Sequence, residues 1–568
     1  MTRFHVITSV YIPYRFGVEC FINSKTDNNW GLIEMQKKPV FLRDATGLVK
    51  QFSAFDAFIL NNGILNVLVG TPLAFTIALF LFPGIDLTVA MFVGFLASVP
   101  FALVYIQMTA AMPRSGGDYA WVSRTLHPAL GFMTSWALVI ISIYGPMVSV
   151  AYTFSQFFLS TQFGILGALT NNPALSELGA SMSSPVMSFS VASIIMIVMA
   201  VITALGLKAV RATYYVLFTI MMIGVFAIMG LFAITSTADF ARAFDTYSSG
   251  LGTTYHGVLD AAKGAGWAPS YDLGAAFSAL PVTTLMYGGF TYIVYLGGEV
   301  KRSDRTLLYS IMGTLLIGLV MWGGSALFFS RTVGYDFLRA SAYLAFVHPE
   351  ANPLKVLAVY SLFISVLTVA NPPLFWLIFL AFVVSYLIFI PSYFLIITRN
   401  IFAWSFDRIA PSVLADVNDR FHTPVKSIIL TLVAAEIACL IWAFQPVVFS
   451  WFNTTLAWTA IWIVPGVAAM VFPFRRKEIY RASPSITKKE IAGIPVVSIC
   501  GVLLVIIMVW ALVYGYLTPA FSGPTLPLAI AVTAGIFITG PIVFYIARAI
   551  RKSQGIDLDL VFKEVPPE

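Results

Sequence analysis

Long apolar stretches recur along almost the whole chain and are separated by short polar segments. A helix that crosses a bilayer needs about 20 mostly apolar residues, and stretches of that length predict twelve membrane-spanning helices. They lie near residues 55–82, 87–111, 130–159, 187–207, 213–234, 276–298, 307–330, 374–404, 425–445, 449–472, 494–517 and 526–550. We therefore expect an all-α, polytopic membrane protein with its transmembrane domain over residues 52–550.

A thirteenth apolar stretch, residues 356–370, is shorter and ends at Asn371-Pro372-Pro373. Because a segment of this length spans a bilayer poorly, we interpret it as a helix in or over the outer face, or as a re-entrant piece. If it crossed the membrane, every later loop would change sides.

The distribution of basic residues tests this topology. With residues 1–51 in the cytoplasm, most Lys and Arg residues fall in cytoplasmic segments, namely 37–50, 114–124, 208–211, 301–305, 399–426, 475–489 and 548–563. The outer loops hold only Arg242, Lys263, Arg331, Arg339 and Lys355. Basic residues favour the cytoplasmic side, so we predict a cell-membrane protein whose N-terminal segment and tail (551–568) are both cytoplasmic.

The composition agrees with a lipid environment. Charged residues make up only 10% of the chain, whereas a soluble domain has about 25%. The net charge of +7 does not indicate a nucleic-acid partner, because the basic residues lie in short loops between apolar stretches. The three cysteines form neither a disulfide framework nor a metal-ligand spacing.

The two ends of the chain differ from the apolar domain. Arg15 and Glu19 interrupt any signal-peptide core in the first 34 residues. We hypothesise that Met35 is the natural start, and that residues 1–34 are either upstream translation or a disordered arm. The tail after Lys552 is short and acidic, and we expect it to be disordered.

Residue patterns typical of catalysis are missing from the sequence. None of the five histidines pairs with another histidine or a cysteine at metal-ligand spacing, and no nucleophile elbow or phosphate-binding loop stands in a suitable context. We therefore predict that the protein is not an enzyme and needs no metal or other cofactor.

Two spans carry helix-breaking residues in matching places. The first contains Asn61-Asn62-Gly63, Asn66 and Gly70-Thr71-Pro72, and the sixth contains Gly288-Gly289. These spans open the two halves of a five-plus-five repeat, and transporters built from inverted repeats bind substrate at such discontinuous helices. Free N–H groups suit a carboxylate and free C=O groups suit an ammonium, so paired interruptions suit an amino acid. The alternative is that these glycines only permit close helix packing.

Acidic residues in or near the spans are further candidates. Glu436, in the ninth span, is a candidate for proton coupling, with a buried structural carboxyl as the more common alternative. Asp56 and Glu299 lie near helix ends, where we expect them to cap a helix or to pair with Lys301 and Arg305.

Four motifs resemble those of the amino acid–polyamine–organocation (APC) superfamily of transporters. The loop Pro113–Trp121 is the most specific, followed by Tyr287–Arg305 with Gly298-Glu299, Thr398–Pro411 with Thr423-Pro424, and Phe55-Asp56-Ala57. Their order and spacing agree over roughly residues 40–550. The resemblance implies two inverted five-helix repeats with broken helices 1 and 6, two further helices, and alternating access to a central site.

The resemblance also implies roles for individual residues. By position, the substrate site would be formed by Gly63, Ile64, Leu65, Asn66, Gly70, Met286, Tyr287, Gly288, Gly289 and Phe290. A cytoplasmic gating or packing element would include Arg114, Gly116, Gly117, Tyr119, Glu299 and Lys301. Residues 356–370 would correspond to the family's external helix.

The chain departs from the family pattern at several positions. Val67 and Val69 stand where many members have glycines, Thr291 replaces a carboxylate, and residues 213–234 contain no lysine. The position that binds sodium in some members is apolar here. The coupling ion, the amino acid, the direction of transport and the oligomeric state therefore stay open.

The leading interpretation is an amino acid permease, a secondary active transporter with a mainly apolar or neutral pocket. An exchanger, a facilitator and a polyamine or organocation carrier are the open alternatives within the family. A non-transporting substrate sensor would need an added soluble domain or a long tail, and an enzyme would need a catalytic cluster. A channel would need a continuous pore lining, and saturable uptake would distinguish a carrier from it.

Overall fold

The computed structural model describes residues 50–354, 359–451, 453–518 and 526–563, all within one compact unit, Thr46–Glu568. In this part of the chain, eleven helical segments are long and apolar enough to cross a membrane. The sixth predicted span is divided into shorter helices. The eleven long segments and this divided span together correspond to the twelve predicted spans. The expectations for Met35 and residues 1–34 lie outside the described residues.

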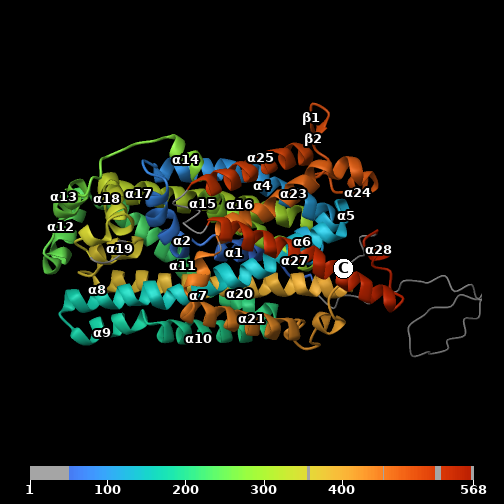
Figure 1. Ribbon diagram of the computed structural model, residues 1–568, viewed down its shortest axis with the longest axis horizontal. Helices are drawn as coiled ribbons and strands as arrows, with labels where there is room; N and C mark the ends of the chain where they lie inside the picture. Colours follow the sequence, from blue (N-terminus) through green and yellow to red (C-terminus); the bar gives the residue numbers. More distant parts are fainter. Residues whose placement is uncertain (1–49, 355–358, 452, 519–525, 564–568) are drawn as a thin grey trace, which may run out of the picture. The chain divides into compact units, whose positions relative to one another are not determined.

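Four spans are composed of several helical pieces (Figure 1). The first contains α1 (Ala54–Ile64), α2 (Val67–Pro72), the π-helical turn η1 (Leu73–Ile77) and α3 (Ala78–Leu81). The third contains α6 (Pro128–Ser142), η2 (Ile143–Met147), α7 (Val148–Thr153), η3 (Phe154–Leu159) and α8 (Ser160–Thr170). The sixth contains α14 (Gly274–Ser278), α15 (Leu280–Tyr287), the 3₁₀ helix η5 (Gly288–Tyr295) and η6 (Gly297–Glu299), and the seventh contains α16 (Ser303–Gly318), η7 (Leu319–Gly323) and α17 (Gly324–Val333).

The other spans are single helices: α4 (Leu87–Ala111), α10 (Pro185–Ala204), α11 (Leu207–Ile234), α20 (Pro372–Phe406), α21 (Val425–Phe444), α23 (Thr454–Arg475), α25 (Val496–Leu517) and α27 (Leu526–Ser553). The shorter helices are α5 (Asp118–Thr125), α9 (Pro173–Met182), α12 (Thr237–Ser248), η4 (Ser249–Leu251), α13 (Tyr255–Gly264), α18 (Tyr335–Phe346), η8 (Pro349–Ala351), α19 (Tyr360–Thr368), η9 (Ser412–Ala415), α22 (Val447–Ser450), α24 (Lys477–Ala482) and α28 (Leu558–Val561). The only strands among the described residues, β1 (Glu490–Ile491) and β2 (Ile494–Pro495), form one small hairpin.

Local signals in the sequence explain where many spans begin. Pro128, Pro185 and Pro372 occupy the first turn of their helices, where the missing N–H has no intrahelical partner to lose. The side chain of Asp86 caps α4 by accepting from the Thr88 and Val89 backbone N–H groups at 2.9 and 3.1 Å. These caps satisfy the backbone donors that a helix leaves free at its start.

The third span is longer than predicted, because it continues to Thr170 instead of ending near residue 159. The span was predicted to end early because α8 contains polar residues. One of them, Gln162, is satisfied by another helix, since the Ser365 hydroxyl of α19 donates to its side-chain oxygen at 2.7 Å. The helix ends where Asn171 adopts a left-handed backbone conformation, with φ of 50°.

Spans one and six lie beside each other in the interior. Helix α1 packs against η5, α16 and α20, while α15 packs against α4. Around them, α10 pairs with α21 along the lower edge of Figure 1, and α23 pairs with α25 along the upper edge. Spans one and six are thus in contact with each other and lie between these two helix pairs in the view of Figure 1.

Several short helices gather at one end of the bundle, on the left of Figure 1. There α13 contacts α12 and α18, and α12 contacts α19. Helix α19 is the described part of the thirteenth apolar stretch, and most of its side chains are buried. It has nine residues, too few to cross a bilayer.

The tail was predicted to be disordered, but the residues that the structure describes, up to 563, include the short helix α28. Leu558 and Val561 of α28 are buried, as is the neighbouring Phe562. The Phe562 ring lies 4.9 Å from the Arg124 guanidinium carbon and packs on Phe544 of α27. These apolar residues anchor the end of an otherwise acidic segment.

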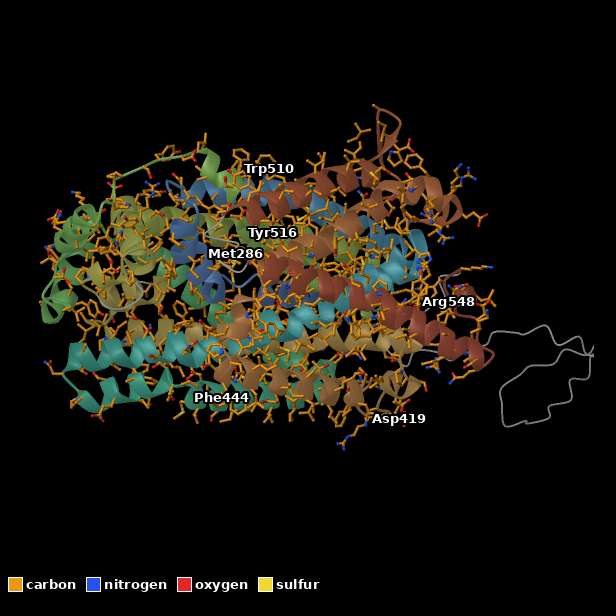
Figure 2. The ribbon with its side chains drawn as sticks, viewed as in Figure 1. Met286, Asp419, Phe444, Trp510, Tyr516 and Arg548 are labelled. Carbon is orange, nitrogen blue, oxygen red and sulfur yellow. The ribbon has the colours of Figure 1, made fainter. Side chains whose placement is uncertain are left out.

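Large apolar side chains are exposed on the outward surfaces of the spans. Trp510 and Phe444, labelled on opposite edges of the view in Figure 2, are each 49% exposed. Such surfaces are unfavourable in water and are expected where helices face lipid. The chain is a multi-pass membrane protein.

Candidate functional site

The first span is interrupted between α1 and α2, at Leu65 and Asn66. Helix α1 ends at Ile64, Asn66 has φ of −46° and ψ of 107°, and α2 begins at Val67. Two polar groups at the interruption, one from the backbone and one from a side chain, have partners on other spans. The Leu65 backbone carbonyl accepts from the Trp322 indole N–H at 3.1 Å, and the side-chain amide nitrogen of Asn66 donates to the Ser385 backbone carbonyl at 2.9 Å.

The sixth span changes from α-helix to 3₁₀ helix at Gly288. Its Gly289 touches the first span so closely that a Cβ there would lie 2.5 Å from the Leu65 backbone nitrogen. Nearby, the Asn61 side-chain oxygen accepts from the Ile293 backbone N–H at 3.0 Å. The two interruptions are therefore in direct backbone contact, which a side chain at residue 289 would prevent.

A cavity of about 370 Å³ lies beside these interruptions. Six of the ten predicted substrate-site residues line it: Ile64, Asn66, Gly70, Met286, Gly288 and Gly289. Met286 is labelled in Figure 2, where it lies among the helices, between the short helices at the left end and Arg548 at the right. A Cβ on Gly70 would lie 2.9 Å from the Met286 sulfur, so glycine brings these two spans together at the wall.

The other four predicted residues do not line the cavity. Leu65 contacts Gly289, and Tyr287 packs its ring against Phe95. The remaining two, Gly63 and Phe290, pack against the side chains of other spans. These four residues therefore pack against neighbouring residues outside the cavity lining.

The rest of the cavity wall consists of residues that were not predicted for the substrate site. They come from spans one, three and six to ten: Val69, Leu73, Pro146, Ser149, Val150, Leu285, Tyr292, Trp322, Phe389, Tyr393, Trp442, Thr454, Thr455, Trp458 and Trp462. Tryptophan in an apolar span faces lipid as readily as a cavity, so the sequence carried no signal for these side chains.

The comparison with known families agrees with this fold. Residues 52–544 match the amino acid permease family. The chain belongs to this family.

Individual relatives match the permease over short stretches. It is 34% identical over 62 residues to the human Asc-type amino acid transporter 1, which corresponds to 11% of this chain and 12% of that protein, and the mouse counterpart matches to the same extent. It is 25% identical over 114 residues to Uncharacterized protein 399 of Sulfolobus islandicus rod-shaped virus 1, or 20% of this chain and 26% of that protein. The matches thus cover about an eighth to a quarter of the length of these relatives.

In the permease, the loop Pro113–Trp121 packs against the end of the sixth span. Gly116 donates its backbone N–H to the Tyr295 carbonyl at 3.0 Å, and Ser115 forms an antiparallel bridge with Leu296. Gly117 has φ of 55°, and a Cβ there would lie 2.6 Å from the Tyr295 ring. Both the backbone conformation and the close contact require glycine.

Asp118, at the start of α5, is buried in this contact. Its carboxylate accepts from the Tyr105 hydroxyl at 2.9 Å and from the Tyr295 hydroxyl at 3.1 Å. Burial raises the pKa of the Asp118 carboxyl to about 6, against the lowering effect of these hydrogen bonds. The loop thus holds an acidic group that titrates near neutral pH.

Glu299 pairs with a residue that is distant in the sequence. Its two carboxylate oxygens accept from Arg399 Nε at 2.7 Å and Nη2 at 3.1 Å, and both side chains are fully buried. The prediction that Glu299 pairs with Lys301 and Arg305 is wrong, because the fold brings Arg399 of span eight against the end of span six. Lys301 instead uses its backbone N–H to bond the Phe52 carbonyl at 3.1 Å.

A second buried pair joins the loop region to the end of span eight. Arg124 donates to Asp407 at 2.8 Å, and the Tyr119 hydroxyl donates to the same carboxylate at 2.8 Å. The Arg114 guanidinium carbon lies 5.2 Å from the Phe406 ring centre. Arg114 and Tyr119, both predicted for a gating or packing element, thus contact residues at the end of span eight.

Asp56 and Glu436 lie apart from the cavity lining. Asp56 forms a capping box with Ser53 at the start of α1, as one of its two expected roles. Glu436 lies on α21 and accepts from the Ser193 hydroxyl of α10 at 2.6 Å. A hydrogen bond of this kind is what the structural alternative expects, and proton coupling at Glu436 stays a prediction.

Proposed function

We propose that the permease is a secondary active transporter that carries amino acids by alternating access. The substrate would bind in the cavity with its charged groups at the interruptions of spans one and six. The observation that carries this proposal is the backbone contact with Leu65 made by Gly289, which lines the cavity. Unwound segments of this kind present N–H groups for a carboxylate and C=O groups for an ammonium.

The direct test is uptake of radiolabelled amino acids by proteoliposomes, with and without an imposed proton or sodium gradient. Saturable uptake of one group of amino acids is the expected result, and its dependence on the gradients identifies the coupling ion. Folded protein that takes up no amino acid in either direction of exchange would overturn the proposal.

Gly288→Leu tests whether the substrate binds at span six. A Cβ at Gly288 would lie 2.9 Å from the Trp462 ring, so a leucine there crowds the cavity without adding charge. We expect uptake to be abolished while expression and folding stay near normal. Gly230→Leu is the matched control, because a Cβ on this exposed glycine of α11 has no neighbour within 4 Å.

We also propose that both termini are cytoplasmic, in a protein of the cell membrane. The support is that basic residues from separate segments meet, since Arg476 bonds the Arg124 carbonyl and Arg551 bonds the Arg408 carbonyl. Clusters of this kind mark the cytoplasmic side. Labelling of a cysteine placed beside Lys552 should require permeabilised cells, and labelling in intact cells would reverse the orientation.

The main alternatives differ in which solute is transported and under which conditions. An obligate exchanger would take up substrate only with amino acid inside the vesicle, and an organocation carrier would transport amines in place of amino acids. A non-transporting sensor would bind substrate without uptake under any gradient. The same proteoliposome preparation separates these cases.

A further inference from the structure

The cavity wall contributed by span nine is a single tryptophan, Trp442, held in a fixed position. Its indole N–H donates to the Tyr144 carbonyl at 2.8 Å, and its ring lies 6.1 Å from that of Tyr152. Unlike Trp458 and Trp462, which are 2% exposed, Trp442 is only partly buried. Trp442 is therefore covered less completely by its neighbours than these two indoles, and it lines the cavity.

A π-helical turn makes the partner of Trp442 available. Tyr144 lies in η2 (Ile143–Met147), where Gly145 has ψ of −107° and interrupts the regular helix. A π-turn changes the pattern of backbone hydrogen bonds and leaves carbonyl groups for other donors, and such turns are frequent at functional sites. The backbone of span three thus fixes the orientation of an aromatic side chain on span nine.

The charge of the cavity restricts the ligand. Among the described residues that line it there is no Asp, Glu, Lys, Arg or His. A charged side chain of a substrate would be buried there without a partner of opposite sign, which is strongly unfavourable. Aromatic faces attract cations, but this attraction is weaker than the desolvation penalty of an unpaired buried charge. The ligand's side chain is therefore uncharged.

The size and surface of the cavity restrict the ligand further. Its volume of about 370 Å³ is bounded by four indoles and several aliphatic side chains. A small side chain would leave part of this apolar space without contacts, whereas a large apolar or aromatic one fills it and gains both burial and ring stacking. Hydroxyl groups on the wall come from Ser149, Thr454, Thr455, Tyr292 and Tyr393. The two tyrosine hydroxyls are hydrogen-bonded to each other at 2.6 Å, which leaves few partners for a polar side chain of this size.

We infer that the permease selects neutral amino acids with large apolar or aromatic side chains, and that Trp442 is the residue that sets this preference. The inference rests on the proposed transport function and specifies the substrate class of the same cavity. Trp442 acts as a rigid wall for the substrate side chain, while the interruptions of spans one and six bind the charged groups common to all amino acids.

The test compares the KM values of phenylalanine and alanine uptake in proteoliposomes for wild type, Trp442→Ala and Trp442→Phe. We expect wild type to prefer phenylalanine. Trp442→Ala should shift the ratio of the two KM values toward alanine by about tenfold, because one aromatic contact is lost. Trp442→Phe keeps a ring but not the N–H, and should keep the preference for the large substrate.

Trp510→Ala is the matched control. Trp510 also donates its indole N–H to a backbone carbonyl, that of Phe277, but it lies half exposed on the outer face of α25. Its removal should leave the KM ratio unchanged. The ratio reports selectivity, so a loss of stability common to both variants does not move it.

Each outcome decides between the two proposals. Wild-type uptake that favours alanine, lysine or glutamate would overturn the inference and leave amino acid transport standing. An unchanged KM ratio in Trp442→Ala would remove the role of this residue. Absence of uptake of every amino acid, or transport of organic amines only, would overturn the proposed function and the inference with it.

Discussion

Glu299→Gln breaks a buried ion pair and should strongly destabilise the permease. Glu299 and Arg399 are both fully buried and joined by two hydrogen bonds of 2.7 and 3.1 Å. Removing one partner of such a pair leaves the other charge uncompensated, at a cost of about 3–5 kcal/mol. Arg399 also reaches the Thr398 hydroxyl at 3.4 Å, and glutamine still accepts one hydrogen bond. We therefore expect a loss near the lower end, about 3 kcal/mol.

Unfolding in mixed micelles with increasing denaturant, followed by tryptophan fluorescence, measures this free energy. Asp239→Asn is the control, because Asp239 and Arg242 form an exposed pair, and we expect little change from it. In a double-mutant cycle with Arg399→Gln, the double variant should lose much less than the sum of the single variants. Uptake should fall in Glu299→Gln if the pair also holds the end of span six in its working position.

A loss below about 1 kcal/mol, the ordinary value of a surface pair, would refute the reasoning. It would mean that water or a rearranged neighbour compensates Arg399. Additive losses in the double variant would likewise show that Glu299 and Arg399 do not act on each other.

Three further changes probe other parts of the site. Gly289→Ala places a methyl group 2.5 Å from the Leu65 nitrogen and should reduce uptake about tenfold or more through overpacking of about 1–3 kcal/mol; Gly313→Ala, with only ordinary contacts, should transport normally, and equal uptake by both contradicts the prediction. Burial raises the pKa of Asp118 from 3.8 to about 6, so the protonated carboxyl contributes stability that is fully present only below pH 3.8 and is lost as the pH rises through 6. The stability of Asp118→Asn relative to wild type should therefore increase by about 2 kcal/mol from pH 4 to pH 7, and a constant difference in denaturant unfolding would refute this. Trp322→Phe removes the N–H that bonds the Leu65 carbonyl and should lower the free energy of unfolding by about 0.5–1.5 kcal/mol, whereas wild-type stability would contradict the importance of this hydrogen bond.

The spans were the most predictable part of the fold. A segment in lipid must satisfy all its backbone groups internally and expose apolar side chains, so length and hydropathy alone locate it. Helix α4 has the predicted bounds, 87–111. The short helices α12, α13 and α18 were not predicted, because helices with mixed composition lack this signal.

The candidate site was predictable only where it depends on backbone conformation. Gly288 and Gly289 indicate an interruption because glycine destabilises the interior of a helix. The aromatic wall gave no signal, because Trp442 and Trp510 both lie in apolar spans and only the fold distinguishes a cavity from lipid. The partner of Glu299 was also missed, since the sequence suggests near neighbours and Arg399 is a hundred residues away.

Two of the spans that line the cavity are much longer than a bilayer is thick. The third runs for 43 residues and α20 for 35, or about 65 and 52 Å at 1.5 Å per residue, against a hydrocarbon core of about 30 Å. Such helices meet the bilayer by tilting or by extending beyond it, and their tilt responds to membrane thickness. Ser149 and Tyr393 on these helices line the cavity. We therefore expect lipid chain length to influence the geometry of the cavity, so that the choice of lipid affects substrate binding.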